Sequence, residues 1–283
     1  MGAAVRLFSL GLVVVVASGC QESTAPAGGP TTAKSTGATL RGKSSQSDAP
    51  AVVSEADARA AREVVERAIQ AHAGSSERLD KLRAFTSAGK GTMVTAAGPM
   101  SAVRDFKASF PDLFRLDSRV TVGDQSATAT LAVNGLSGWM QQVGGPREEL
   151  PLDRLVEIRN SLNVYWLATL IPLRDKAVTI KPLPDATVDG ALAAVLQATQ
   201  RNRPAVSLFF DKRSGLLVKA SYRGPDADVE VLKDVSFLEH QEFEGLKLPT
   251  KEIEYFDGRK MSEWIISDYK FPDRLDREVF EKP

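Results

Sequence analysis

The feature that most constrains the fold is a succession of short segments in which apolar and polar residues alternate, separated by turns of a few residues. Residues 114–122 (FRLDSRVTV) have this period of two, which is typical of a β-strand with one buried face. Asn134 and Gly135 are a strong hairpin signal. Parallel strands need crossovers of about a dozen residues or more, so short turns predict antiparallel neighbours. The sequence therefore predicts a large antiparallel sheet.

The second half of the chain continues this pattern. Residues 191–199 have a composition that also suits a helix, but they lie between an Asp-Gly turn and a hairpin, so we assign them to a strand. The other expected strands, most of them separated by short turns, are residues 127–133, 206–211, 216–222, 229–243, 247–256 and 260–269.

Helices are expected before the sheet and once within it. Ser54 opens a capping-box pattern, and apolar residues then recur at helical spacing until Gly74. A second short helix is expected over residues 75–82. Between Pro151 and Pro172 an amphipathic stripe predicts another helix. This helix must pack its apolar stripe on something, and the concave face of a curved sheet is the obvious partner.

The N-terminal segment, residues 1–19, has the pattern of a secretory signal peptide. Arg6 precedes an apolar run over residues 7–16, and small residues follow. Crossing a bilayer takes about 20 apolar residues, so the run is short for a membrane span. A short anchor helix that stays attached is the alternative interpretation.

Residues 16–20 (VASGC) resemble the bacterial lipobox. The resemblance implies diacylglycerol on the sulfur of Cys20, cleavage before it, and acylation of the new amine. Two or more acyl chains anchor a protein stably where one does not. A free or buried thiol at Cys20 is the alternative. Gln21 stands where an Asp would imply retention in the inner membrane, so this resemblance favours the periplasmic face of the outer membrane.

The region after Cys20, residues 20–53, is rich in Ser, Thr, Ala, Gly and Pro, with few charges and no aromatic residue. Such a segment buries too little apolar area to offset its ordering entropy. We therefore expect a disordered tether over residues 20–53 and a single folded domain over residues 54–283.

Composition excludes several classes of protein. The chain has 36 Lys and Arg and 36 Asp and Glu, which leaves no positive surplus to bind nucleic acid. One cysteine excludes an internal disulfide, and one cysteine with two histidines argues against a zinc site. We expect no metal and no cofactor.

Motifs of catalysis are also missing. Residues 89–94 begin like a dinucleotide-binding loop but lack the third glycine and lead into a strand. There is no Gly-x-Ser-x-Gly elbow, no Walker loop and no His-Glu-x-x-His motif. A catalytic triad would need His72 or His240. We expect His72 to act structurally, with an imidazolium suited to the C-terminal end of its helix, and His240 to lie at an exposed strand end. An enzyme is therefore not expected.

A set of strand, turn and core features carries a resemblance to a known family. These features are Lys90-Gly91-Thr92, residues 111–115, Asn134-Gly135 with Trp139, residues 208–212 and 215–218, Leu248-Pro249, residues 255–260, 267–270 and 279–283. From about residue 56 onward, the chain resembles bacterial lipoproteins with the fold of the periplasmic lipoprotein carriers LolA and LolB. The resemblance implies a mainly β (α+β) fold: an unclosed β-barrel whose concave side is covered by helices and whose carriers hold acyl chains between the two.

A curved sheet with one apolar face and few covering helices leaves a groove. The candidate lining residues are Phe114, Leu116, Val120, Leu131, Val133, Trp139, Leu208, Phe210, Tyr255, Trp264 and Ile266 from the sheet, and Leu155, Leu162 and Trp166 from the covering helix. Each of them could instead be packed core. The sequence thus predicts a membrane-anchored periplasmic lipoprotein that binds acyl chains or lipidated partners, in outer-membrane lipoprotein sorting. The alternative is a structural or protein-binding envelope module with a filled groove.

Overall fold

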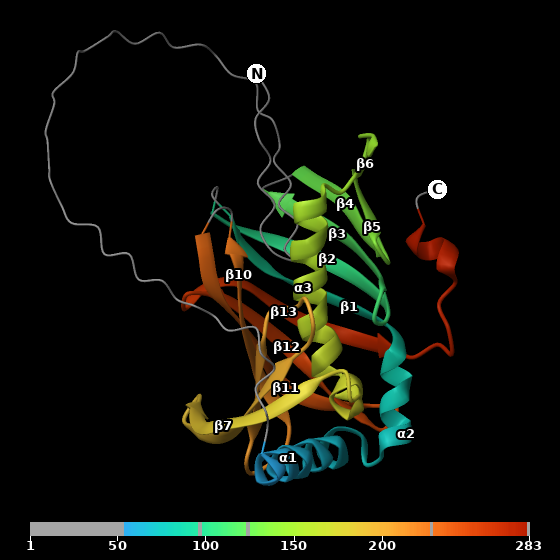
Figure 1. Ribbon diagram of the computed structural model, residues 1–283. Coiled ribbons are helices and arrows are strands. Elements are labelled where there is room, and N and C mark those ends of the chain that lie inside the picture. Colours follow the sequence, from blue (N-terminus) through green and yellow to red (C-terminus); the bar gives the residue numbers. More distant parts are fainter. Residues whose placement is uncertain (1–53, 96–97, 123–124, 227–228, 282–283) are drawn as a thin grey trace, which may run out of the picture.

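The computed structural model describes residues 54–95, 98–122, 125–226 and 229–281. The predicted signal peptide, Cys20 and the predicted tether lie outside these residues. The described part is mainly β, as predicted: 13 strands form one antiparallel sheet that curves without closing (Figure 1). The strands are β1 (Ala84–Thr95), β2 (Gly98–Ser109), β3 (Leu113–Val122), β4 (Gln125–Asn134), β5 (Ser137–Gln142), β6 (Arg147–Glu149), β7 (Thr179–Val188), β8 (Ala191–Thr199), β9 (Val206–Asp211), β10 (Leu217–Asp226), β11 (Val229–Phe243), β12 (Leu246–Phe256) and β13 (Arg259–Lys270).

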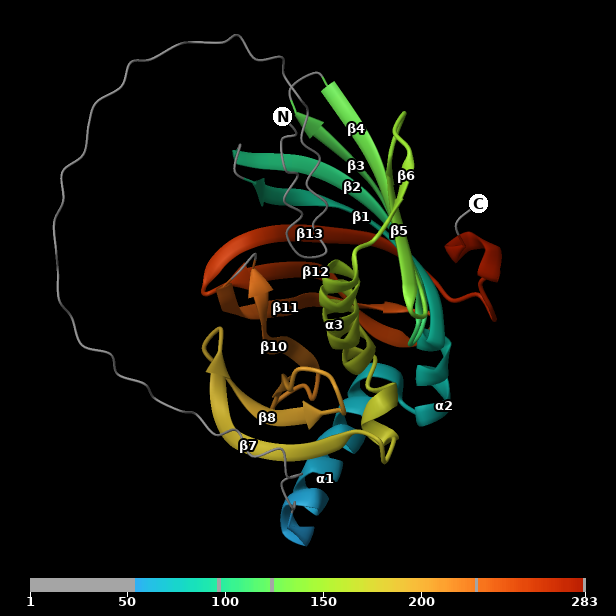
Figure 2. The ribbon, with the colours of Figure 1, turned by 45° about the horizontal axis from the view of Figure 1, so that its top comes forward.

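Two meanders build the sheet. From β1 in the middle, the chain runs outward strand by strand to β6 at one edge, and later returns from β7 at the other edge to β13, which pairs with β1. The helix α3 (Leu152–Ala168) connects β6 to β7. Because it joins opposite edges of the curved sheet, α3 passes across the concave side, where Figure 2 shows it enclosed by the strands.

The structure confirms the beginning and the end of the first helix predicted from the sequence. Helix α1 (Glu55–Ala73) is capped by Ser54, whose hydroxyl accepts the Asp57 N–H at 3.1 Å, and it ends at Gly74 with φ of 68°. The expected second helix is present as α2 (Ser76–Leu79), followed by a 3₁₀ turn. The 3₁₀ helices are η1 (Asp80–Arg83), η2 (Ile171–Arg174) and η3 (Arg277–Phe280).

The seam between the meanders depends on two glycines of β1. A Cβ on Gly91 would lie 2.0 Å from the Glu263 carbonyl oxygen, and one on Gly89 would lie 2.8 Å from that of Ile265. Only glycine lets β1 approach β13 this closely. Residues 89–94 are therefore strand, as the sequence indicated, and not a phosphate-binding loop.

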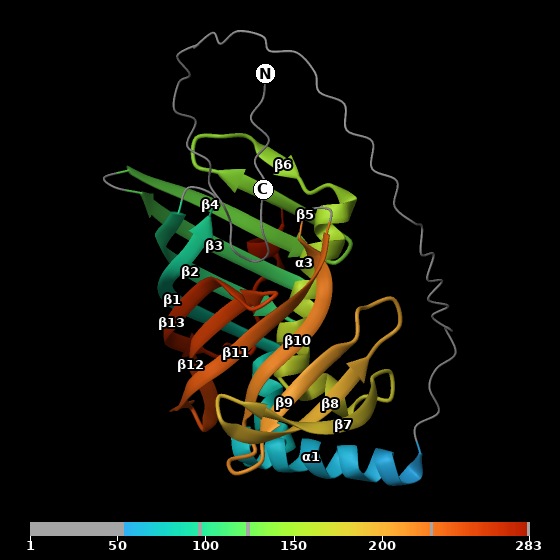
Figure 3. The same cartoon turned by 90° about the vertical axis from the view of Figure 1, so that its left-hand side faces the viewer.

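The edge strand β7 was not among the strands expected from the sequence, and it contains Pro182 and Pro184. Proline cannot donate a backbone hydrogen bond, so within sheets it is confined mostly to edges, and β7 lies at one. Its neighbour β8 (Ala191–Thr199) confirms the strand assignment of the ambiguous segment. Figure 3 shows α1 packed below the second meander, beside β7.

The core is divided by α3 into two main clusters. The larger one joins α1, the C-terminal half of α3 and the second meander, and includes Leu167, Leu208 and Phe210. The smaller one joins α3 to the first meander and includes Phe114 and Leu162. The two faces of α3 therefore hold the two halves of the sheet together.

Candidate functional site

Three hollows follow one another along α3, and each contains side chains of that helix. Leu155 lines the first, Leu162 and Trp166 line the second, and Tyr165 lines the third. A helix of 17 residues is about 25 Å long, so the three positions span much of the concave side. The covering helix and the sheet beneath it are the candidate site.

The edge hollow, of about 500 Å³, lies where the β4–β5 turn, the start of α3 and the C-terminal η3 meet. Leu136 and Leu152 at this hollow are 82% and 75% exposed. It is lined by Asn134, Leu136, Ser137, Gly138, Trp139, Glu149, Leu150, Leu152, Leu155, Phe280 and Glu281.

The middle hollow, which we call the arginine pocket, has a volume of about 30 Å³. Arg203 Nη1 donates to Asn160 Oδ1 at 3.2 Å, and Arg159 lies 3.8 Å from Asp112. Burial and the neighbouring Arg159 lower the pKa of Arg203. Two guanidiniums and a single carboxylate meet here, so this pocket is polar. Its small volume also makes it narrow.

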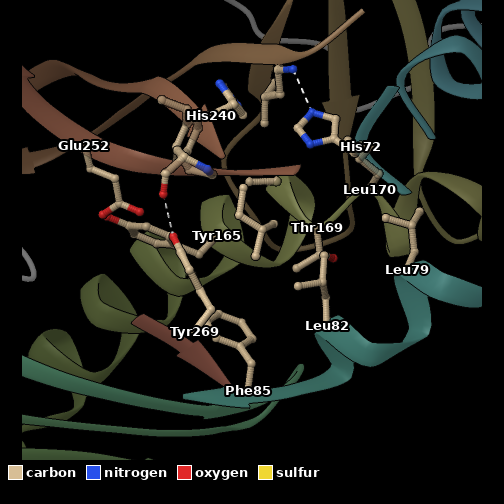
Figure 4. Close-up of a pocket in the computed structure, with 15 residues that line it drawn as sticks. His72, Leu79, Leu82, Phe85, Tyr165, Thr169, Leu170, His240, Glu252 and Tyr269 are labelled. Carbon is tan, nitrogen blue, oxygen red and sulfur yellow. Dashed lines mark hydrogen bonds between the residues drawn. The ribbon is translucent and has the colours of Figure 1, made fainter. Parts of the chain in front are cut away.

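The histidine cavity, of about 70 Å³, lies between the C-terminal part of α3, the N-terminal helices and strands β11 to β13 (Figure 4). Its wall is mostly apolar, and its polar groups come from six side chains. It is lined by His72, Leu79, Leu82, Phe85, Tyr165, Ala168, Thr169, Leu170, Leu217, Phe237, His240, Leu248, Pro249, Glu252 and Tyr269.

His72 joins α1 to two strands. Its Nε2 accepts the Leu217 N–H at 2.9 Å, so the ring proton lies on Nδ1, which donates to the Lys247 carbonyl at 2.8 Å. Burial lowers the pKa of His72 to about 4. The expected structural role fits this geometry, but the expected imidazolium is wrong, because the desolvated ring is neutral at pH 7.

His240 contradicts its sequence-based interpretation. It was expected at an exposed strand end, but it is half-buried beside His72, with ring centroids 5.6 Å apart and edge to face. Its Nε2 is buried and has no hydrogen-bond partner. Burial, together with the neighbouring His72, lowers the pKa of His240 to about 4. Both imidazoles at the cavity are therefore neutral at pH 7.

Buried charges continue from the cavity across the concave face. Arg104 donates to Glu252 at 2.5 Å and lies over the ring of Trp264 at 4.4 Å. The adjacent Glu254 accepts from the Ser262 hydroxyl at 2.7 Å, and burial raises the pKa of its carboxyl. The concave face is thus not uniformly apolar, since a paired ionic row crosses it.

The structure places most predicted lining residues in packed core. Phe114, Leu116, Leu131, Val133, Leu155 and Leu162 belong to the smaller cluster, with Trp166 against it; Leu208, Phe210 and Ile266 belong to the larger one; Val120 and Trp264 pack with Met93 and Met100 in a third cluster. Val133, Leu162 and Trp166 also line the arginine pocket, and Leu155 lines the edge hollow.

Two predicted residues lie on the other face of the sheet. Trp139 opposes Ala132 and donates its indole N–H to the Phe280 carbonyl at 3.3 Å, beneath η3 on the convex side. Tyr255 opposes Asp234, and both point away from α3 because the adjacent Lys233 points toward it. The structure therefore does not bring these two side chains together with the covering helix, although Trp139 also borders the edge hollow.

None of the predicted residues lines the histidine cavity. His72 and His240 drew attention in the sequence only as rejected catalytic candidates, and nothing in the sequence pairs them. The only sequence features that could have pointed to this cavity were a histidine at the end of a helix and another within a strand. Among the described residues there is no group of three His, Cys, Asp or Glu side chains that could hold a metal ion.

Comparisons with known proteins support the fold. No family model matches the chain, and no curated protein matches it. Among solved structures, the chain is similar to a LolA superfamily protein from Nitrosomonas europaea, with a TM-score of 0.52 and 14% identity over 78% of this chain and 97% of that one. It is also similar to an outer membrane lipoprotein-sorting protein domain from Vibrio parahaemolyticus, with a TM-score of 0.48, 13% identity and the same coverage.

These comparisons define the class of fold. The chain has a LolA-like fold, and its structural neighbours include LolA superfamily and lipoprotein-sorting proteins. Such a likeness at 14% identity concerns the fold alone. Within the described ranges, no helix is both long and apolar enough to cross a membrane.

Proposed function

We propose that this protein is a non-catalytic lipid-binding lipoprotein of the cell envelope that holds acyl chains, free or attached to a partner lipoprotein, between α3 and the concave face of the sheet. The single observation that carries the proposal is the crossover helix with a hollow near each end, one at Leu155 and one at Tyr165. The LolA-like fold supports the same substrate class by analogy.

The packing of α3 explains how room for a chain would arise. The edge hollow of about 500 Å³ is of the size of ligand sites, whereas the histidine cavity of about 70 Å³ admits only the end of a chain. Between them Leu162 and Trp166 contact the sheet. A chain reaching from one hollow to the other displaces these two contacts, so binding is coupled to a movement of α3.

The experiment uses the full chain with Cys20→Ser, so that any lipid detected is a ligand and not a modification. Native mass spectrometry is expected to detect co-purified lipid. Trp139 borders the edge hollow, so the quenching is measured in a Trp139→Phe background. A brominated acyl chain is expected to quench Trp166 there, and the quenching should be lost on Trp166→Phe. The matched variant Trp264→Phe in the same background, whose ring packs with Met93 and Met100, should retain it. Absence of both bound lipid and quenching would contradict the proposal.

The proposed anchor is the acylated Cys20, which holds the domain on the periplasmic face of the outer membrane. Cleavage of residues 1–19 and acylation of Cys20 add a characteristic mass to the mature N-terminal peptide. Mass spectrometry of that peptide, with membrane fractionation of the wild type and Cys20→Ser, tests the anchor. A membrane-bound Cys20→Ser protein, or an unmodified Cys20, would count against it.

The packed core favours a second candidate, a non-enzymatic envelope module that binds proteins and has a filled groove. Phe114, Leu208 and Phe210 are almost completely buried among other side chains of the protein. In-cell crosslinking from Leu136, which is 82% exposed at the edge hollow, is then expected to capture a protein partner. The two candidates differ in the lipid assay, which stays blank only for the second.

A further inference from the structure

We propose that the histidine cavity selects acyl chains that end in a neutral hydrogen-bonding group, such as an ester, amide or alcohol, over free fatty-acid anions, with Nε2 of His240 as the group that binds this polar end. The inference rests on the proposed function, because it names the class of ligand that the same site accepts. A comparison of the hydrogen-bond partners of the polar groups that line the cavity supports it.

Four other polar side chains of the cavity have hydrogen-bond or ion-pair partners. The Tyr269 hydroxyl donates to the Pro249 carbonyl at 2.8 Å, and the Thr169 hydroxyl donates to that of Trp166 at 2.7 Å. Glu252 is held by Arg104, and both ring nitrogens of His72 bond to backbone. Nε2 of His240, in contrast, is buried without a partner. A buried polar atom without a partner is costly, and a ligand group that bonds it recovers that free energy.

The charge at the cavity determines which ligand group fits. The nearest carboxylate, Glu252, already takes the Arg104 guanidinium, so that cation is not available to a second anion. Burial keeps the His240 imidazole neutral, with a pKa of about 4, and raises the pKa of the Tyr165 phenol, which is neutral as well. A fatty-acid carboxylate placed here would be a desolvated anion near Glu252.

A neutral group meets none of these penalties. A neutral imidazole offers one N–H and one lone pair, so Nε2 donates to an ester or amide carbonyl in the tautomer that carries the proton there, and bonds a hydroxyl in either tautomer. The apolar remainder of the wall, with Leu79, Leu82 and Phe237 among its side chains, accepts the methylenes next to that group. The cavity of about 70 Å³ is large enough for this end of a chain and not for a whole chain.

The test is a competition at pH 8 with the full chain carrying Cys20→Ser. Dodecanol, methyl dodecanoate and dodecanoate displace the fluorescent aromatic-amine probe N-phenyl-1-naphthylamine. We expect the alcohol and the ester to compete at about tenfold lower concentration than the carboxylate, since one satisfied buried hydrogen bond is of that order. In His240→Leu this preference should fall to less than about twofold, while His240→Gln should retain part of it. Glu242→Gln, an exposed change on the same strand, should behave as wild type.

The outcomes separate the two proposals. Probe binding with equal competition by all three ligands, or an unchanged preference in His240→Leu, overturns the selection by His240 and leaves acyl binding in place. If neither the probe nor any ligand binds, acyl binding itself is wrong and this inference fails with it. Because the wild-type series alone measures the preference, the test does not depend on the folding of any His240 variant.

Discussion

Nζ of Lys233 lies 3.3 Å from Oε1 of Glu157, and this ion pair joins β11 to the covering helix α3 inside the protein. Lys233 is only 2% exposed, and its ammonium also lies 4.7 Å from the centre of the Phe256 ring. A desolvated lysine is tolerable only when it is paired in this way. The position of α3 over the sheet therefore depends on a charge as well as on apolar packing.

Breaking this ion pair from one side should destabilise the protein strongly. Glu157→Leu leaves the buried ammonium of Lys233 without its carboxylate, at an expected cost of about 3–5 kcal/mol in unfolding free energy. The double variant Glu157→Leu/Lys233→Met removes both charges and should recover most of that loss. Urea denaturation of the two variants and the wild type measures the difference.

A control for this comparison is the exposed pair Lys81–Glu244, whose side chains are 42% and 58% exposed. Lys81→Met should change the unfolding free energy by less than about 1 kcal/mol. If Glu157→Leu were as mild as this control, the ion pair would not hold α3.

The two histidines predict a pH dependence with a definite sign. Burial lowers the pKa of His72 and of His240 from 6.5 to about 4. Between these values the unfolded chain binds protons that the folded protein does not, so the unfolding free energy falls as the pH is lowered from about 6.5 toward 4. The loss is of the order of 3 kcal/mol for each group at most. The raised pKa of Glu254 acts in the opposite direction.

Nuclear magnetic resonance separates the histidines from Glu254. The chain has two histidines, so two imidazole Hε1 signals are expected, and both should titrate near pH 4 instead of 6.5. A midpoint near 6.5 for His240 would mean that its ring is solvated, in contrast to the buried Nε2 of the structure.

Local signals in the sequence predicted the elements, whereas the site depends on contacts between distant segments. The caps Ser54 and Gly74 and the alternation of residues 114–122 are local and were confirmed. The histidine cavity forms because α1 and β11 bring His72 next to His240, and no pattern within either segment indicates that contact. The pairing of β1 with β13 likewise joins the two ends of the domain.

Strand β12 shows why the alternation alone misplaced a residue. Ile253 and Tyr255 alternate with Glu252 and Glu254, so the pattern predicts that the glutamates face water. In the structure both glutamates are buried on the concave face, because Arg104 pairs with Glu252 and the Ser262 hydroxyl bonds Glu254. Arg104 is 148 residues from Glu252 in the sequence, so the alternation within β12 does not indicate this pairing.

Gly91 lies where the two meanders meet, and its substitution should destabilise the protein. Gly91→Ala places a methyl group within 2.0 Å of the Glu263 carbonyl oxygen, which is backbone and cannot move away without breaking the β1–β13 ladder. We expect a loss of about 1–3 kcal/mol or more in unfolding free energy. Thermal denaturation measures it, with Lys90→Ala, an exposed change in the same strand, as the control. Equal melting temperatures for both variants would show that the strands separate more easily here than the geometry implies.

Phe280 lies on the convex side of the first meander, and its substitution should also destabilise the protein. This side chain is fully buried in η3, and the backbone beside it accepts hydrogen bonds from the Trp139 indole and, at Val279, from Arg115. Phe280→Ala should cost about 3–5 kcal/mol because it leaves a cavity against the sheet. Arg277→Ala in the same turn, whose side chain is 71% exposed, should cost less than about 1 kcal/mol. Both variants can be followed by urea denaturation, and the Trp139 fluorescence of Phe280→Ala should shift to the red as its indole becomes solvated. A wild-type emission spectrum in Phe280→Ala would mean that η3 does not cover Trp139.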